Sequence, residues 1–169
     1  LKTDKKNKMS PPKRFIFNLP NSQESGKLTD TIKEGTAITE GIKLTKDLAN
    51  LPANLCTPTI MAESAKKLAN EAGLTINILD EAAIKKAGMG GLLAVAQGSQ
   101  EPVKFITLEY RGAAEQKPVV LVGKGVTFDS GGICLKPAAG MEEMKYDMSG
   151  AASVMGIFKT ITELKLPLN

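Results

Sequence analysis

The feature that most constrains this chain is an apolar run, Pro118 to Val122, that passes directly into a glycine-rich loop over residues 123–137. The loop carries Lys124, Asp129 and Lys136. A short apolar run of this kind favours a buried strand. We therefore expect the loop to lie at the carboxyl end of a central strand of an α/β sheet, where such sheets usually bind ligands.

Helical and strand-like segments alternate along the rest of the chain, which favours an α/β fold with a mixed central sheet flanked by helices. A long helix over residues 28–49 is predicted to bury one face, formed by Leu28, Ile32, Ile38, Ile42 and Ala49. A second helix begins after Thr57-Pro58 and ends at Gly73. The other expected elements are a strand over 74–78, a short helix from Asp80 to Lys86, buried runs or strands over 92–96 and 103–110, and a helix from Ser149 or Gly150 to about Pro167.

Composition limits the class of protein. The 169 residues, 42% of them hydrophobic, can bury one ordinary core. No run of about 18 apolar residues is long enough to cross a bilayer. Cys56 and Cys134 are too few and too far apart for a disulfide framework or a cysteine zinc site, so we expect a reducing cytoplasm and two buried thiols.

The charge is uneven. Residues 1–14 carry six basic side chains and Asp4, a net charge of +5 within a chain whose total is +4. Such an arm can bind the phosphates of nucleic acid, or it can be a solvated segment. The absence of interleaved aromatic residues favours the solvated segment.

Several familiar sites can be excluded at the loop. A phosphate-binding P-loop needs Ser or Thr after Gly-Lys, but Gly125 follows Lys124. A dinucleotide fingerprint from Gly88 would need glycine where Leu93 stands. Ser130 lies in surroundings like those of a trypsin-type nucleophile, yet the chain contains no His to serve as its base.

A site of carboxylates and lysines remains. Asp129 and Asp147 are natural ligands for Mn²⁺, Mg²⁺ or Zn²⁺. Lys124 can join them only as a neutral amine whose proton the metal displaces; otherwise it is an ordinary solvated lysine. Asp147 has a second interpretation as an acid that interacts favourably with the dipole of the following helix.

Three segments of this region closely resemble the leucyl aminopeptidase family, the cytosol aminopeptidases with two metal ions. They are Val122 to Gly132, Lys136-Pro137 and Gly140 to Ala152, and the segments Lys46 to Asn54 and Ala94 to Ser99 are similar to further family segments. The resemblance covers nearly the whole chain from about Pro11. It implies part of a Zn-peptidase-like catalytic domain and a metal-binding role for Lys124.

The resemblance also implies the roles of the other residues. Lys124, Asp129 and Asp147 match metal ligands for two divalent ions, Mn²⁺ or Zn²⁺, and Lys136 matches a catalytic lysine. Met144 either lines the pocket for an apolar first side chain or packs in the core. The implied partners are peptide substrates with an amino-terminal leucine and further copies in a hexamer, in the cytoplasm and without a membrane.

The family motif Asn-Thr-Asp-Ala-Glu-Gly-Arg-Leu, which supplies the remaining ligands and a catalytic arginine, is absent from these residues. We therefore expect residues 1–27 to be a linker from a missing domain and 28–169 to be the N-terminal half of the catalytic domain. Such a chain, alone, should be inactive, bind metal weakly and self-associate. The alternatives are a DNA-binding protein that uses the basic arm, because some bacterial relatives in this family bind DNA, and a non-catalytic scaffold.

Overall fold

The structure, a computed structural model, describes residues 12–20 and 24–169. It divides into two compact units, residues 1–36 and 37–169. In the first unit, residues 12–20 have no regular structure, and their large apolar side chains, Phe15, Ile16, Phe17 and Leu19, are exposed. Most of the basic arm that sequence analysis considered for nucleic-acid binding lies outside the described residues.

Helix α1 (Ser25–Ala49) confirms the long helix but not its predicted buried face. Three of the five predicted core residues are 43–53% exposed: Ile32, Ile38 and Ile42. The buried positions are Ala37, Gly41, Leu48 and Ala49. The prediction was wrong because the neighbouring helix packs against the small residues of α1, which allow two backbones to approach, rather than against its isoleucines.

Helix α2 (Pro58–Ala72) has the predicted boundaries. The Thr57 hydroxyl accepts a hydrogen bond from the backbone N–H of Ile60 at 3.3 Å, and Pro58 occupies the first turn, where its missing N–H costs nothing. Gly73 closes the helix with a left-handed φ of 67°, a conformation that glycine adopts without steric cost. The helix buries Met61, Ala65 and Leu68.

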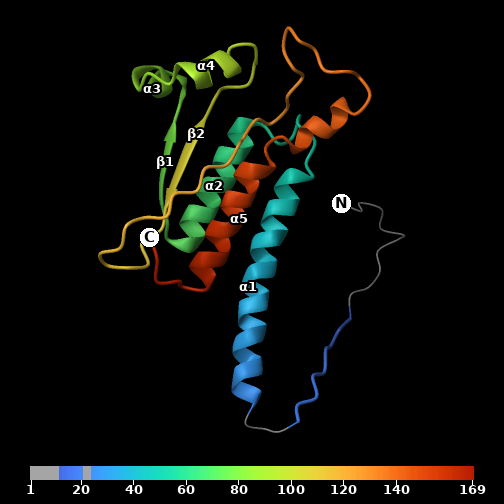
Figure 1. Cartoon of the computed structure of the whole chain (residues 1–169), viewed down its shortest axis with the longest axis vertical. Helices are drawn as coiled ribbons and strands as arrows, with labels where there is room; N and C mark the ends of the chain where they lie inside the picture. The colour runs from blue at the N-terminus through green and yellow to red at the C-terminus, as the bar shows by residue number, and fades with distance from the viewer. Residues whose placement is uncertain (1–11, 21–23) are drawn as a thin grey trace. The chain divides into compact units, whose positions relative to one another are not determined.

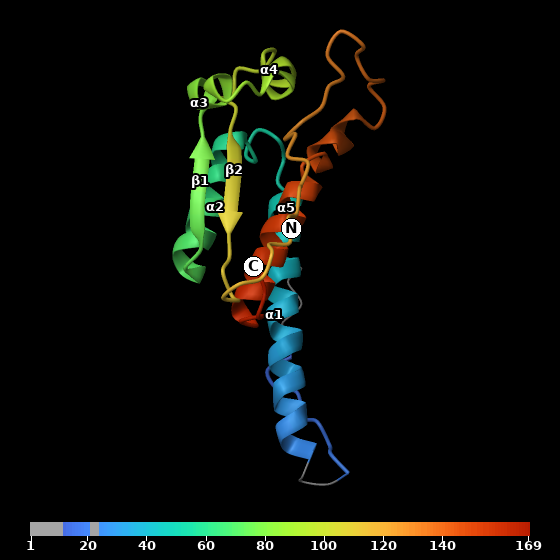
Figure 2. The same ribbon diagram turned by 60° about the vertical axis from the view of Figure 1, so that its left-hand side comes forward.

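Strands β1 (Thr75–Leu79) and β2 (Phe105–Glu109) pair antiparallel, with Ile76 opposite Leu108 and Ile78 opposite Ile106. Helix α2 packs against both strands and against helix α5 (Ser149–Glu163) (Figure 1). Helix α3 (Glu81–Lys86) begins as predicted, because the Asp80 carboxylate accepts from the Ala83 N–H at 2.9 Å. Helices α3 and α4 (Gly90–Ala96) contact each other at one end of the sheet (Figure 2).

Two expected strands are absent from the described chain. Residues 92–96 belong to α4, since a short apolar run fits a helix as well as a strand. The run from Pro118 to Val122 forms no ladder, and Val120 and Val122 are 76% and 92% exposed. The described sheet therefore has two strands, and the Lys124 loop does not follow a central strand. The α/β class with helices flanking a sheet is confirmed.

The core lies where α2, α5 and the end of α1 meet the sheet, around Met148, Ala152 and Met155. Cys56 belongs to this core, and burial raises the pKa of its thiol. Cys134 is exposed, contrary to the prediction, because it lies in the glycine-rich loop. Among the described residues, no helix is both long enough and apolar enough to cross a membrane.

Helices α1 and α5 cross at two glycines. A methyl group on Gly41 would meet the backbone oxygen of Gly156 and the Thr160 hydroxyl. The Thr45 hydroxyl lies 3.2 Å from the Ala152 carbonyl of α5, and the Thr160 hydroxyl lies 3.3 Å from the Ala37 carbonyl of α1. Each hydroxyl also donates to a carbonyl of its own helix, Thr45 to Gly41 and Thr160 to Gly156. Each threonine therefore contacts backbone carbonyls of both helices at the crossing.

We expect Gly41→Ala to lower the free energy of unfolding by about 1–2 kcal/mol, because overpacking against a backbone oxygen outweighs the gain in helix propensity. Urea denaturation followed by circular dichroism measures the change. Gly35→Ala is the matched control, since a methyl group there meets nothing within 4 Å. Equal stability of the two variants would contradict the close crossing.

Candidate metal centre

The loop between Asp129 and Lys136 is closed at its base by one backbone hydrogen bond and one bond from the backbone to a side chain. The Lys136 N–H donates to the Ser130 carbonyl at 2.9 Å, and the Gly131 N–H donates to Asp129 Oδ1 at 2.8 Å. Gly131 and Gly132 have φ values of 92° and 72°, which side chains other than glycine rarely adopt. Gly131 and Gly132 are therefore required by the backbone of this loop.

Asp129 and Lys136 form an ion pair across the base of the loop. The distance from Lys136 Nζ to Asp129 Oδ2 is 3.4 Å, and each side chain is 36% exposed. The Gly131 N–H is the largest cause that lowers the pKa of Asp129, and the charges of Lys136 and Lys124 lower it further. Asp129 is therefore held as a carboxylate by Gly131, Lys136 and Lys124, and Lys124 also belongs to a second ion pair.

Lys124 and Asp147 form that second pair, with 2.6 Å between Lys124 Nζ and Asp147 Oδ1. The Asp147 side chain is only 18% exposed, whereas that of Lys124 is 60% exposed. Asp147 lies between the 3₁₀ helix η3 (Met141–Tyr146) and α5. Its other oxygen, Oδ2, is buried without a hydrogen-bond partner. A buried carboxylate oxygen without a partner is costly, so this atom is available to a cation.

The donors fit a divalent ion in kind. Carboxylate oxygens suit hard divalent cations, and a lysine amine can bind such an ion once its proton is lost. The number of donors is small, however, because no group of three or more His, Cys, Asp or Glu side chains comes together in the described part of the chain. The structure thus brings Lys124, Asp129, Lys136 and Asp147 into one charged region. This region offers fewer donors than a complete metal site.

Met144 lies in η3, close to this region through its backbone. Its carbonyl accepts from the Asp147 N–H at 3.2 Å, and the residue is half-buried. Sequence analysis considered Gly150 only as a possible start of the last helix and did not single out Gly123. A methyl group on Gly123 would meet the backbone of Gly150 and Ala151, and one on Gly150 would meet the backbone of Lys124. The run of small residues from Ser149 to Ala152 was the sequence signal that could have indicated this close backbone contact.

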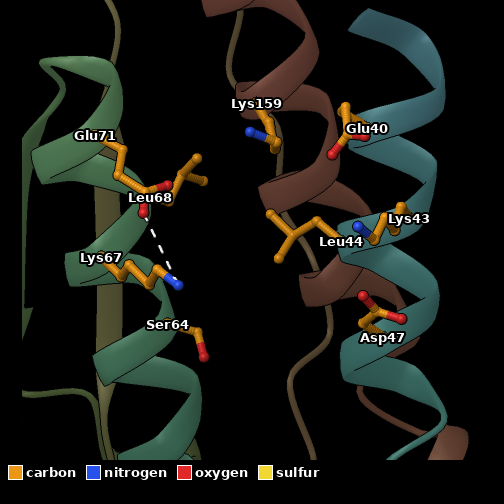
Figure 3. Close-up of a pocket in the computed structure, with 9 residues that line it drawn as sticks. All are labelled: Glu40, Lys43, Leu44, Asp47, Ser64, Lys67, Leu68, Glu71 and Lys159. Carbon is orange, nitrogen blue, oxygen red and sulfur yellow. Dashed lines mark ion pairs between the residues drawn. The ribbon is translucent and has the colours of Figure 1, made fainter. Parts of the chain in front are cut away.

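A separate cleft of about 310 Å³ lies between α1, α2 and α5, and its lining side chains are drawn in Figure 3. None of the predicted site residues lines it. Two of its lysines are paired with acids: Lys67 with Glu71 at 3.9 Å, and Lys159 at 2.8 Å with Glu163, which does not line the cleft. The hydrogen bond from Lys159 to Glu163 is the main cause that raises the pKa of that lysine.

The charged region lies within a segment that matches a known family. The profile described as the cytosol aminopeptidase family, catalytic domain, matches residues 43–169. The chain belongs to the cytosol aminopeptidase family. The match includes Lys124, Asp129, Lys136, Met144 and Asp147.

Relatives with curated descriptions support the same family assignment. The chain is 53% identical over 171 residues to a probable cytosol aminopeptidase of Thioalkalivibrio sulfidiphilus, covering all of this chain and 34% of the relative. It is 53% identical over 153 residues to the cytosol aminopeptidase of Pseudomonas aeruginosa, covering 89% of this chain and 31% of the relative. The chain thus spans about a third of the length of these relatives.

Two solved structures show the same fold. The bottromycin maturation enzyme BotP in complex with Mn has a TM-score of 0.74 and 40% identity, covering 83% of this chain and 30% of that one. The apo leucyl aminopeptidase of Trypanosoma cruzi has a TM-score of 0.76 and 35% identity, covering 80% of this chain and 27% of that one.

We expect the Asp129 carboxyl of the metal-free chain to titrate below the ordinary aspartate pKa of about 3.9. Its contribution to stability is therefore present above that value and is lost as the pH falls through the lower folded-state pKa. Carbon-13 NMR titration measures the midpoint. Lys136→Met should raise the midpoint only in part, because the Gly131 N–H remains, whereas Lys159→Met should leave it unchanged. A midpoint at or above the ordinary value would contradict the geometry.

Proposed function

We propose that this chain is part of a metal-dependent leucyl aminopeptidase that releases amino-terminal residues, leucine preferred, from peptides in the cytoplasm. The observation that carries the proposal is the pair of lysine–carboxylate contacts, Lys124–Asp147 and Lys136–Asp129, within the segment that matches the family profile. Two carboxylates and one lysine amine are donors that can hold a divalent ion without a histidine, and the second lysine remains free for catalysis.

Lys124, Asp129 and Asp147 would hold the metal, proposed as two divalent ions, Mn²⁺ or Zn²⁺. The unpartnered Oδ2 of Asp147 supports this assignment, and BotP, at 40% identity, is described in complex with Mn. Bound divalent ions supply Lewis-acid chemistry that polarises a peptide carbonyl and activates water. In the protein's own structure, Lys124 Nζ lies 2.6 Å from Asp147 Oδ1, so the two proposed ligands are already in contact.

Lys136 is proposed as the catalytic lysine. Its ammonium is paired with Asp129, and the side chain as a whole is 36% exposed, so a substrate can reach it. A fixed positive charge beside the scissile carbonyl stabilises the negative charge that develops on the carbonyl oxygen in the transition state. The backbone bond from Lys136 N–H to Ser130 fixes the start of the side chain and so reduces the reorganisation that the reaction requires.

Met144 is proposed to line the pocket for the first side chain of the peptide. Its backbone bond to Asp147 places it one turn of η3 away from a proposed ligand. A thioether side chain is flexible and apolar, which suits a pocket for leucine. The assignment depends on the metal centre. The free amine and the side chain of the first residue are bonded to the same α-carbon, so a pocket for that side chain must lie close to the metal.

We further propose that residues 1–27 form a linker and residues 28–169 the N-terminal half of the catalytic domain, in a protein that assembles as a hexamer. The supporting observations are the coverage of about a third of the relatives' length and the exposed run from Pro118 to Val122. With two carboxylates and one lysine as ligands, the 169-residue chain alone should bind metal weakly and show little turnover.

The longer protein that contains this sequence should hydrolyse leucine amide when Mn²⁺ is present. Lys136→Ala should lower kcat by about 10²–10³-fold, the cost of losing one group that stabilises a developing oxyanion. Steady-state kinetics measure the loss. Lys117→Ala is the control, because that lysine is exposed and has no assigned role. Full activity of Lys136→Ala, or activity without any divalent ion, would overturn the proposal.

The 169-residue chain should self-associate through its exposed apolar run, Pro118 to Val122. Val122→Lys should reduce the apparent mass measured by light scattering, because a charge on an exposed strand-like edge opposes pairing between chains. Val95→Lys is the matched control, since Val95 is 69% exposed on α4, away from the run. A natural chain that remains monomeric at high concentration would contradict this expectation.

A further inference from the structure

The first turn of α5 packs directly on the backbone that carries Lys124. The Ala151 N–H donates to the Lys124 carbonyl at 2.8 Å. A methyl group on Gly123 would lie 2.6 Å from the Gly150 oxygen and 2.7 Å from the Ala151 nitrogen. A methyl group on Gly150 would lie 2.9 Å from the Lys124 nitrogen. These distances are shorter than real contacts of a methyl carbon, so neither glycine can be replaced without a backbone shift.

The need for glycine at these two positions is one of space. Neither Gly123 nor Gly150 has the left-handed φ that marks Gly131 and Gly132. Gly150 lies within α5, where alanine has the higher intrinsic helix propensity. Propensity and packing therefore make opposite predictions for Gly150→Ala, and only the close contact with the 123–124 backbone opposes the substitution.

The same contact fixes both members of the Lys124–Asp147 pair. Asp147 lies two residues before α5, and its backbone is held by its own N–H bond to Met144 and by the Ser149 hydroxyl, which donates to the Tyr146 carbonyl at 2.6 Å. When α5 sets the position of Lys124, it therefore also sets the distance from Lys124 to Asp147.

The ion pair cannot fix this geometry by itself. The Lys124 side chain is 60% exposed, and exposed ion pairs contribute little because two flexible side chains must be ordered in water. Something other than the charges must bring the two backbones together. The backbone contact between α5 and the 123–124 segment is the interaction that does so.

We propose that Gly123 and Gly150 are positioning residues, which hold Lys124 against Asp147 by allowing the first turn of α5 to touch the lysine's own backbone. Their role toward metal rests on the proposed function, whereas their role in the ion pair does not. A side chain at either position moves α5 away from the 123–124 segment and separates Lys124 from Asp147.

Zero-length crosslinking with a carbodiimide tests the contact in the full 169-residue chain without metal. The reagent joins an amine and a carboxylate that already touch, and mass spectrometry of the peptides measures the Lys124–Asp147 product. The Lys159–Glu163 pair, at 2.8 Å on α5, is the internal reference in the same sample. Gly150→Ala should lower the ratio of the first product to the second by about tenfold, because small misplacements strongly slow reactions between positioned groups.

Two control variants separate positioning from general destabilisation. Gly156→Ala introduces a clash at the crossing of α1 and α5, so it should destabilise the chain yet leave the crosslinking ratio unchanged. Gly125→Ala, whose methyl group would lie at an ordinary 3.4 Å from the Ala151 side chain, should keep both stability and ratio. An unchanged ratio in folded Gly150→Ala, or an equal loss in Gly156→Ala, would overturn the proposal.

Gly123→Ala tests the same contact from the loop side if Gly150→Ala does not fold, as judged by circular dichroism. It should also lower the crosslinking ratio. If neither variant folds while Gly125→Ala does, the contact determines folding as a whole, and the narrower positioning role is overturned.

Titration with Mn²⁺, followed by electron paramagnetic resonance of the free ion, separates this inference from the proposed function. Gly150→Ala should bind Mn²⁺ about 10–100-fold more weakly than the natural chain, the usual cost of removing a group that orients a metal ligand. If the natural chain binds no Mn²⁺ but the crosslinking ratio still falls in Gly150→Ala, the metal-binding role proposed for these residues fails and the positioning role stands. Equal Mn²⁺ affinity in the two chains, with the ratio reduced, would overturn the role toward metal.

Discussion

Close backbone contact along helix α5 is the constraint on which the larger unit depends. Near its start, Gly150 packs on Gly123, and in its middle Gly156 packs on Gly41. These contacts are so close that no side chain fits at the four glycines. Helix α5 therefore contacts α1 and the 123–124 segment through backbone atoms. The residues between and beside these contacts, including Met148, Ala152 and Met155, form the core against α2. One helix therefore organises both the packing and the charged region.

The charged region follows from this arrangement. Lys124 and Asp147 meet because α5 begins two residues after Asp147 and contacts the lysine's backbone. Asp129 and Lys136 meet for a local reason, because the loop between them closes through Gly131 and Ser130. One pair thus depends on tertiary packing and the other on loop geometry, although Lys124 is near enough to affect the pKa of Asp129.

Elements with local signals were predicted well. The caps at Thr57, Gly73 and Asp80 depend on residues within three or four positions, so α2 and α3 could be placed from the sequence. Elements that depend on partners were predicted poorly. The 92–96 run has no periodicity that separates helix from strand, and the run ending at Val122 becomes a strand only if another strand pairs with it. The predicted buried face of α1 was wrong because α5 packs against the small residues of α1 rather than against its isoleucines.

The amino-acid sequence by itself determined the membership in the cytosol aminopeptidase family, the candidate residues and the local caps, because these depend on residue identity and short spacing. Only the tertiary structure decided that Lys124 reaches Asp147 across 23 positions of sequence, and that one Asp147 oxygen is buried without a partner. It also decided that Gly123 and Gly150 are needed for space rather than for a left-handed turn. The physical reason is that contact and burial depend on which segments pack together. Segments far apart in the sequence can pack together without any local sequence pattern that indicates it.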